Sequence, residues 1–265
     1  MSVAGLRVIV QPGATPSWNM AMDEALFDSA CESGAAVLRL YTWPAPAVTI
    51  GFTQWREPNS WPVAPSTPIV RRITGGRGIL HGNDVTLSLS LPANVLSRFA
   101  VPRRPMAIYQ WLMPAFVDAF KELEVCAATG THTARAAGAK ADCFATALAG
   151  DLVDRSTGAK VLGAAVRIRQ SGALLQATIP YCREWSELAA IRSCILGARP
   201  DSRPALECRS EELVSAIQHT ISRLIQEPCV AEPARQHELA RAETLANIYA
   251  SPNWNRTGQR PTDTG

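Results

Sequence analysis

The sequence predicts an α+β fold in which mixed or antiparallel sheets are flanked by helices. Residues 85–91 alternate without error between Val or Leu and Thr or Ser, which is the period of a strand with one buried face. Several other segments place apolar residues at helical-turn spacing, as amphipathic helices do. The strand-like segments come in groups, so the strict strand–helix alternation of a parallel α/β sheet is absent.

The first half of the chain predicts a helix, a group of strands and a second helix. Residues 17–30 open with Ser17, a residue type common at helix N-caps, and carry apolar residues along one face. Residues 105–122 begin with a proline, which favours the first helical turn. The apolar or β-branched runs between these helices predict strands over 36–41, 47–52, 68–73 and 85–91.

The second half predicts three strands and three helices. The strands are expected over 151–153, 160–169 and 173–179, joined by short turns into a second sheet, and the helices over 185–196, 210–226 and 232–249. Residues 129–142 have no periodicity and predict a loop. No linker divides the chain, so we expect a single catalytic domain over 1–256 and a polar, frayed tail over 257–265.

The composition narrows the class of protein. The 265 residues are 47% hydrophobic and 18% charged, which favours a large buried core over disorder. No run approaches the roughly 18–20 apolar residues of a membrane span, and the N-terminus lacks a basic segment followed by an apolar one. The net charge is only +3 and no basic run reaches five residues. We therefore expect a soluble cytoplasmic protein that binds neither nucleic acid nor membrane.

The cysteines and lysines point to free thiols and to one notable lysine. The seven cysteines form no C-x-x-C pair and no zinc-type cluster with histidine, so no metal site is expected. Most of these cysteines should be small core residues. Only three lysines occur, Lys121, Lys140 and Lys160, so a lysine inside a candidate site is informative.

The densest functional signal is the segment PIVRRITGGRGILHGNDVTLS at 68–88. A glycine-rich turn exposes backbone N–H groups, and arginines supply fixed donors for anionic or carbonyl oxygens. The segment matches neither of the common nucleotide-binding glycine motifs. On the residues alone, a glycine hairpin with solvent-facing arginines explains it equally well. The residues that carry the signal are Arg71, Arg72, Gly75, Gly76, Arg77 and His81.

This segment resembles the R-R-x-T-G-G-R-x-x-L-H signature of the lipoate-protein ligase A and octanoyltransferase family, part of the biotin/lipoate protein ligase superfamily. Further segments resemble the family's motifs in the expected order: NMAMDEAL at 19–26, LYTWPAPAVTIGFTQ at 40–54, DCFAT at 142–146 followed by DLV at 151–153 and GAKVLGAA at 158–165, and IYASPNWNR at 248–256. The resemblance runs from Trp18 to Arg256 and implies a biotin/lipoate protein ligase-like catalytic fold.

Within the family, the chain is most similar to the cysteine-dependent octanoyltransferases. The resemblance implies a protein octanoyltransferase of lipoate biosynthesis, which moves octanoate from an acyl-carrier thioester, through a cysteine thioester, to a lysine of a lipoyl domain. Three features favour this branch: Arg77 stands where ligases commonly have a third glycine, Cys143 stands at the nucleophile position, and the chain ends soon after the W-N-x-R motif. The implied partners are octanoyl-acyl carrier protein and the lipoyl domains of glycine cleavage H protein or dehydrogenase E2 subunits, without a cofactor.

Two other functions remain open. An ATP-dependent lipoate-protein ligase would use ATP and Mg²⁺ together with a separate accessory domain. A weakened binding paralogue would recognise an acyl carrier or a lipoyl domain without turnover. Departures from the family pattern favour the latter: Gly82 replaces an acid after His81, Ala177 stands where a histidine commonly follows Leu-Gln, and Cys143-Phe-Ala lacks the usual Pro-Ser.

The resemblance also implies residue roles. Cys143 would be the nucleophile, because a thiolate divides one acyl transfer into two easier steps. Lys160 would stabilise the developing oxyanion or, if burial makes it neutral, act as a base. Arg71, Arg72 and Arg77, with the turn residues Gly75 and Gly76, would shape the acyl and carrier site, and a solvent-facing position is the alternative for one of Arg71 and Arg72. His81 would contact the substrate, either orienting a partner or accepting a proton. A structural cysteine, a surface lysine and a structural histidine are the alternatives at 143, 160 and 81, and Cys194 is a rival nucleophile.

Overall fold

The computed structural model describes residues 5–54, 67–130, 142–145, 147, 151–181 and 209–260. The predicted helix over 185–196, most of the loop over 129–142, and Cys194 lie outside these residues. The elements are β1 (Leu6–Gln11), α1 (Pro16–Ser33), β2 (Val37–Tyr41), β3 (Ala47–Ile50), β4 (Ile69–Arg71), β5 (Ile79–His81), β6 (Asp84–Pro92), α2 (Ala93–Arg98), α3 (Pro105–Glu122), β7 (Ala127–Thr129), the 3₁₀ helix η1 (Cys143–Ala145), β8 (Leu152–Asp154), β9 (Lys160–Arg169), β10 (Gly172–Pro180), α5 (Ser210–Ile225), β11 (Cys229–Ala231), α6 (Gln236–Ala250) and α7 (Pro252–Thr257).

Among the described residues the strands form two sheets of unequal size. The large sheet has the order β11-β1-β2-β6-β10-β9-β8-β7, and the small one has the order β4-β3-β5. β1 pairs in parallel with β2 and β11, while β6 is antiparallel to both of its neighbours. The predicted α+β class with mixed sheets is confirmed.

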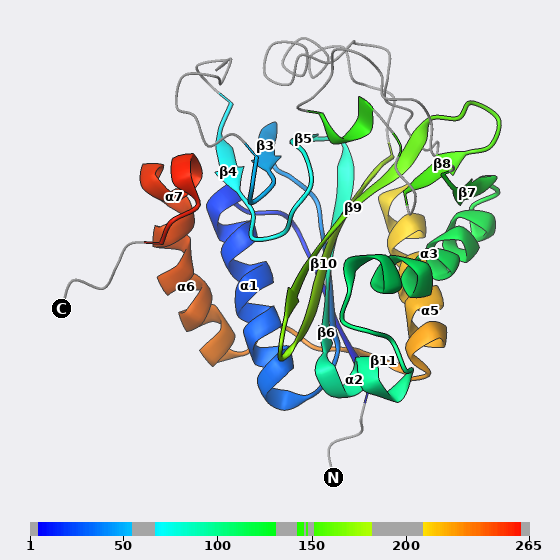
Figure 1. Cartoon of the computed structure of the whole chain (residues 1–265), viewed down its shortest axis with the longest axis horizontal. Helices are drawn as coiled ribbons and strands as arrows, with labels where there is room; N and C mark the ends of the chain where they lie inside the picture. Colours follow the sequence, from blue (N-terminus) through cyan, green and yellow to red (C-terminus); the bar gives the residue numbers. More distant parts are fainter. Residues whose placement is uncertain are drawn as a thin grey trace.

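Helices cover both faces of the large sheet (Figure 1). α3 and α5 bury the apolar face of β6, from Val85 to Leu91, in the main hydrophobic core. α1 lies on the other face, where a second core includes residues of α1, α6 and α7. The small sheet lies beside the first turns of α1, at the end of the large sheet that also carries η1 (Figure 1).

The prediction of a separate second sheet for the three later strands is wrong. β10 pairs along its whole length with β6, so β8, β9 and β10 extend the first sheet. The strand pattern alone cannot distinguish these topologies, because β6 has two edges and both accept partners. The small sheet forms instead from β3, β4 and β5.

Strand β6 is buried on both faces, although its alternation predicted only one buried face. All nine residues are buried, including the hydroxyl-bearing Thr86, Ser88 and Ser90. Register places Ser88 between Arg39 of β2 and Gln176 of β10 on the face that α1 covers. The sheet therefore presents a polar but solvent-excluded face to α1 and the small sheet.

Most predicted helices are confirmed, with shifts at their ends. α3 has the predicted bounds and α5 nearly so. The N-cap of α1 is Thr15, not Ser17, because the Thr15 hydroxyl accepts from the Trp18 N–H and Pro16 occupies the first turn. The helix predicted from 232 starts only at Gln236, after the short strand β11. Pro233, which has no N–H, lies between the two elements.

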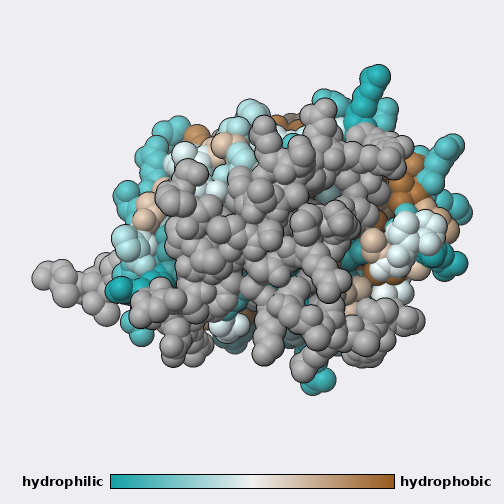
Figure 2. Space-filling view, turned by 90° about the horizontal axis from the view of Figure 1, so that it is seen from above, coloured by the Kyte–Doolittle hydropathy of each residue, from teal (hydrophilic) through white to brown (hydrophobic). Residues whose placement is uncertain are grey.

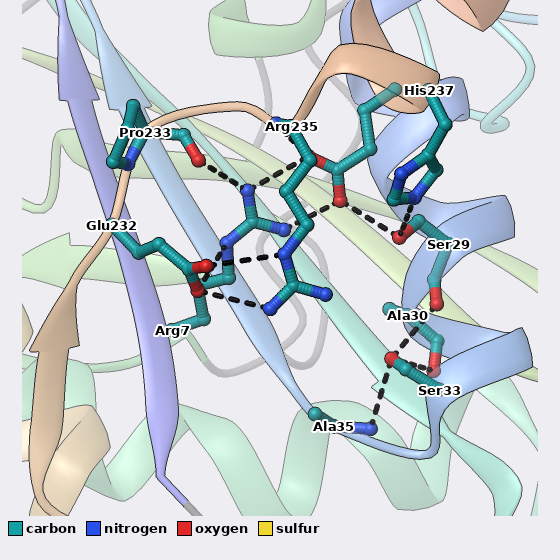
Figure 3. A network of polar contacts seen from close by, with 10 residues as sticks. Arg7, Ser29, Ala30, Ser33, Ala35, Glu232, Pro233, Arg235 and His237 are labelled. Carbon is teal, nitrogen blue, oxygen red and sulfur yellow. Dashed lines mark hydrogen bonds and ion pairs between the residues drawn. The ribbon is translucent and has the colours of Figure 1, made fainter. Parts of the chain in front are cut away.

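A buried ion-pair network ties the N-terminal strand to the C-terminal helices (Figure 3). The Arg7 guanidinium on β1 donates to Glu238 Oε2 at 2.7 Å and lies 3.2 Å from Glu232. The Ser29 hydroxyl of α1 donates to Glu238 Oε1 at 2.7 Å. Glu238 is fully buried, so each of these partners compensates a charge removed from water.

The first residues of the predicted tail are ordered. Gly258 ends α7 in the left-handed conformation, with its N–H on the Trp254 carbonyl. Arg260 pairs with the buried Glu24 of α1. In the described part of the chain, no helix is both long and apolar enough to cross a membrane.

Candidate functional site

Cys143 opens the short helix η1, which packs against β9 at the end of the molecule that carries the small sheet (Figure 1). Its N–H donates to the Gly78 carbonyl at 2.8 Å, and the neighbouring Asp142 bridges the same glycine. The Asp142 carboxylate accepts from the Phe144 N–H at 2.9 Å, as an N-cap does. These contacts fix the thiol against the chain that leaves the glycine-rich turn, and Cys143 is 9% exposed.

Lys160 reaches the Cys143 thiol from the start of β9. Its Nζ lies 3.3 Å from Cys143 Sγ and donates to the Cys143 carbonyl at 3.2 Å. Asp151 completes the group, with Oδ2 at 2.9 Å from the same Nζ. The predicted pair of Cys143 and Lys160 is therefore adjacent, and both side chains are buried.

The surroundings of Lys160 bear on the two roles predicted for it. Burial alone would lower the pKa of Lys160, but Cys143 and Asp151 outweigh burial and raise it above its usual value. This direction favours the ammonium form, which could stabilise an oxyanion. The role of Lys160 as an oxyanion donor or as a neutral base stays a prediction.

Gly163 leaves the space that the Cys143 side chain occupies. A Cβ at this position of β9 would lie 3.3 Å from Cys143 Sγ and 3.2 Å from the Phe144 ring. Ala165, two residues further on the same strand face, packs against the glycine-rich turn near Gly76. The small residues of β9 therefore allow both η1 and the turn to approach the sheet.

The glycine-rich turn between β4 and β5 wraps around the Arg72 guanidinium. Arg72 Nη2 donates to the carbonyls of Gly75 at 2.7 Å and Arg77 at 2.8 Å. Gly76 has a φ of +86°, in the left-handed region that favours glycine. The Gly76 carbonyl lies so close to Gly51 that a Cβ at position 51 would be only 1.9 Å from the carbonyl oxygen. The turn is therefore shaped by an internal arginine, not by solvent-facing ones.

Arg71 points to the opposite side of β4 and binds the chain itself. Its guanidinium donates to carbonyls of the 51–54 segment and of α7, including Phe52 at 2.8 Å and Asn255 at 2.9 Å, and it is fully buried. The Trp254 indole returns a hydrogen bond to the Arg71 carbonyl at 2.8 Å. These contacts join the small sheet to α7, and a substrate contact for Arg71 stays a prediction.

His81 is held in a buried network at the end of β5. Nδ1 lies 2.9 Å from Asp84 Oδ2, Nε2 lies 2.9 Å from Thr49 Oγ1, and the ring stacks on Trp43 with centroids 4.1 Å apart. Thr49 Oγ1 also accepts from Arg72 Nη1 at 3.2 Å. His81 thus reaches the turn through Thr49, and its predicted contact with substrate stays a prediction.

The structure brings in residues that the sequence analysis did not select. Asp151 is one: it belongs to a matched motif but had no predicted role, because only the pairing of β8 with β9 places it beside Lys160. Tyr109 of α3 is another: its hydroxyl donates to the Ala164 carbonyl at 3.4 Å, and burial raises its pKa strongly. Arg167 lies on the same strand face as Gly163, with its guanidinium 5.2 Å from the Phe52 ring centroid. The strand period of β9 could have indicated Arg167 from Gly163.

The other described cysteines lie apart from this site. Cys126 and Cys229 are exposed and Cys31 is half-buried, and all are free thiols. No group of three or more His, Cys, Asp or Glu residues in the described ranges is placed to hold a metal ion. The expected absence of a metal and of a cofactor stays a prediction, as does the choice of Cys143 over Cys194.

Comparison with known proteins places the fold and the family. The model of the lipoyl protein ligase A/B catalytic domain matches residues 15–223. A curated octanoyltransferase, LipM of an Exiguobacterium species, is 34% identical over 173 residues, 61% of this chain and 60% of the relative. LipM of Macrococcus caseolyticus is 34% identical over 112 residues, 41% of this chain and 40% of the relative. The matches therefore span less than two thirds of these relatives.

Two solved structures share the fold. A lipoate-protein ligase A bound with ATP has a TM-score of 0.76 and 17% identity, over 96% of this chain and 99% of the other. A bi-partite lipoate protein ligase of Thermoplasma acidophilum has a TM-score of 0.74 and 18% identity, over 99% and 100% of the two chains. The fold that the sequence motifs implied is confirmed. With this fold and the family match over residues 15–223, the chain belongs to the lipoyl protein ligase A/B catalytic domain family.

Proposed function

We propose that the protein is an octanoyltransferase that carries the acyl group on Cys143. The observation that supports this most directly is the 3.3 Å contact between Lys160 Nζ and Cys143 Sγ, because an adjacent cation favours the thiolate that attacks a thioester. The LipM relatives are named octanoyltransferases, which supports the same activity. The proposed location is the cytoplasm.

The first half-reaction loads the acyl group onto the enzyme. The Cys143 thiolate attacks the carbonyl carbon of the octanoyl thioester, the new carbon–sulfur bond forms, and the bond to the carrier's sulfur breaks. The departing sulfur takes a proton from the Lys160 ammonium and leaves as a thiol. Cys143 is now an uncharged thioester, so one of the two partners that raise the pKa of Lys160 has lost its charge.

The second half-reaction transfers the acyl group to a lysine of a lipoyl domain. The neutral amine of that lysine attacks the Cys143 thioester, the carbon–nitrogen bond forms, and the bond to Sγ breaks. The surplus proton on the nitrogen passes to Lys160, and Cys143 returns as a thiolate. Protons and charges balance over the cycle, and Asp151 pairs with Lys160 whenever Lys160 is charged. No cofactor is needed for either step.

Intact-mass analysis tests this function. The protein is incubated with octanoyl-acyl carrier protein, and a hydroxylamine-labile octanoyl adduct is expected. The adduct should disappear when the lipoyl domain of a glycine cleavage H protein or of a dehydrogenase E2 subunit is added. Pyrophosphate exchange that depends on octanoate or lipoate with ATP and Mg²⁺ would instead identify a ligase. Carrier or lipoyl-domain binding without an adduct would identify a binding paralogue.

A further inference from the structure

Among the described residues, two buried cations lie on the Cys143 side of the candidate site, Lys160 and Arg72, and their partners differ. Lys160 is neutralised by the Asp151 carboxylate at 2.9 Å. Arg72 is 3% exposed, and its guanidinium donates to the hydroxyls of Thr74 and Thr49 and to two carbonyls of the glycine-rich turn. These four acceptors are uncharged, and no carboxylate accepts from Arg72 among the described residues. The site therefore contains one buried positive charge without a directly bound negative partner.

Strand β9 places this charge next to the thiol. Cys143 Sγ lies over Gly163 and Arg72 Nη2 lies over the turn at Gly76, which packs on Ala165. Gly163 and Ala165 are neighbours on one strand face, about 7 Å apart. The peptide chain gives the same placement, because Arg72 binds the carbonyl of residue 77 and the Cys143 N–H binds the carbonyl of residue 78.

We propose that Arg72 is the second cation that supports the Cys143 thiolate, in addition to Lys160. This inference rests on the proposed use of Cys143 as the nucleophile. Opposite charges held over neighbouring residues of one strand face, in a site shielded from water, attract appreciably, whereas the Lys160 charge is shared with Asp151. One hydrogen of Arg72 Nη1 also has no acceptor among the described residues, so it can donate to the acyl oxygen when charge develops there.

The ionisation behaviour of Arg72 agrees with this placement. Burial lowers the pKa of Arg72 to about 10, and Cys143 is the first of the groups that oppose this shift. The other opposing groups are Tyr109 and Tyr41, which are neutral phenols at pH 7. Of the three groups that oppose the shift, Cys143 therefore contributes most to keeping Arg72 charged.

A buried relay fixes the orientation of Arg72. In the neutral imidazole that donates from Nδ1 to Asp84, Nε2 of His81 accepts from the Thr49 hydroxyl, and Thr49 in turn accepts from Arg72. On the other side, Thr74 accepts from Arg72 Nε and donates to Gln176 Oε1 at 2.7 Å. The guanidinium is thus positioned by residues of four strands.

The test is the pH dependence of alkylation of Cys143 by iodoacetamide, followed by peptide mass. This readout depends on the thiolate fraction and needs no acyl substrate. Among the described residues, the charged and titratable groups on the elements packed around Cys143 are Lys160 and Arg167 on β9, Asp151 before β8, Asp142 before η1, Tyr109 on α3 and Arg72 after β4. Because Lys160 titrates in alkaline solution, rates are compared between pH 6 and 9.

Arg72→Gln is expected to slow alkylation at pH 7 about tenfold and to move the profile about one unit toward alkaline pH. Arg72→Lys keeps the charge and should stay within about threefold of the parent. Arg155→Gln removes an exposed arginine from the turn after β8 and should change nothing. The melting temperature of each variant is measured. If Arg72→Gln does not fold, two single variants carry the test instead: Arg72→Lys, and Thr49→Val, which removes the hydroxyl that holds the Arg72 guanidinium.

An unchanged alkylation profile in Arg72→Gln, or in Thr49→Val where only that variant folds, would overturn the inference. A raised KM for the acyl donor with an unchanged profile would make Arg72 a substrate ligand alone. A shifted profile in a protein that never forms an octanoyl adduct would support the role of Arg72 and reject the proposed transferase. The two failures are therefore distinguishable.

Discussion

The buried arginines Arg7, Arg39 and Arg72 have two different kinds of electrostatic surroundings. Arg7, in the network that joins β1 to α6, pairs with Glu238 and Glu232. Arg39 of β2 likewise pairs with the buried Asp23 at 2.7 Å. Arg72, beneath the glycine-rich turn, is equally buried but donates to hydroxyls and carbonyls. Carboxylates neutralise the charges of Arg7 and Arg39, whereas the charge of Arg72 has no carboxylate partner among the described residues.

The difference separates holding the fold from supporting chemistry. A neutralised buried pair is costly to break, because removal of one member leaves the other charge without compensation. A buried charge without a carboxylate partner instead lowers the stability of the fold, and a negative reacting group can offset this cost of burial. Variants in the two regions should therefore change different measurements, stability in one case and reactivity in the other.

The largest expected effect is on acyl loading in Cys143→Ser. A hydroxyl has a much higher pKa than a thiol, so the octanoyl adduct and turnover should be lost completely while the melting temperature stays near that of the parent. Cys229→Ser, at an exposed cysteine, is the matched control and should keep the adduct. Cys194→Ser should also keep it. An adduct on the peptide that contains Cys194, with none on Cys143, would move the nucleophile.

The next effect is on stability in Arg7→Met. This change leaves Glu238 buried without its main partner and should lower the free energy of unfolding by about 3–5 kcal/mol, measured by urea denaturation. Replacing Glu238 as well, in Arg7→Met/Glu238→Leu, should recover much of the loss because the unpaired charge is gone. Equal loss in the single and double variants would assign the effect to packing.

The same pair predicts a pH dependence. Burial would raise the pKa of Glu238, but Arg7 and the other donors outweigh it and the folded-state pKa lies below its usual 4.5. The stabilisation is therefore present above about pH 4.5 and is lost as the pH falls through the lowered value. The stability difference between the parent and Arg7→Met should shrink toward acid pH, and a constant difference would contradict the assignment.

A third effect is on turnover in Lys160→Ala. Loss of the ammonium beside Cys143 removes a donor for the developing charge and the proton carrier of both half-reactions, so the rate should fall on the order of 10²–10³-fold. Folding should be retained, as judged by circular dichroism. Lys121→Ala, at an exposed lysine on α3, is the control. Unchanged turnover in Lys160→Ala would return Lys160 to a structural role.

The smallest effect is expected at the C-terminal end in Arg260→Ala. Arg260 pairs with the buried Glu24, but its side chain is 38% exposed and Arg169 also binds that carboxylate. Solvent screening and the second arginine limit the loss to about 1 kcal/mol in the free energy of unfolding. A loss of several kcal/mol would mean that residues 258–260 are a main support of α1.

Much of the fold follows from local pattern, and the rest depends on contacts between distant segments. The alternation of β6 and the turn spacing of α3 and α5 predict those elements nearly to their ends. Nothing in β6 itself indicates that its hydroxyl face is buried, because that depends on α1 and the small sheet. Three-residue strands such as β5 and β11 are too short to show a period.

The site divides in the same way. Motif resemblance selected Cys143 and Lys160, and the structure places them in contact. It also selected Arg71 and Arg72 together, with a solvent-facing position as the alternative for one of them. Both are buried, on opposite sides of the chain, because consecutive strand residues point to opposite faces. The motifs did not predict a site role for Asp151, because its contact with Lys160 depends on the pairing of β8 with β9.

The contacts of Arg71 have a consequence for where the functional unit ends. The family match stops at residue 223, yet the carbonyls that hold Arg71 belong to Trp254, Asn255 and Arg256. A chain cut at residue 223 would leave a fully buried guanidinium without these acceptors, one residue from Arg72. The smallest fragment that keeps these acceptors for Arg71 therefore extends through α7. Tags or fusions at the C-terminus are best joined beyond residue 260.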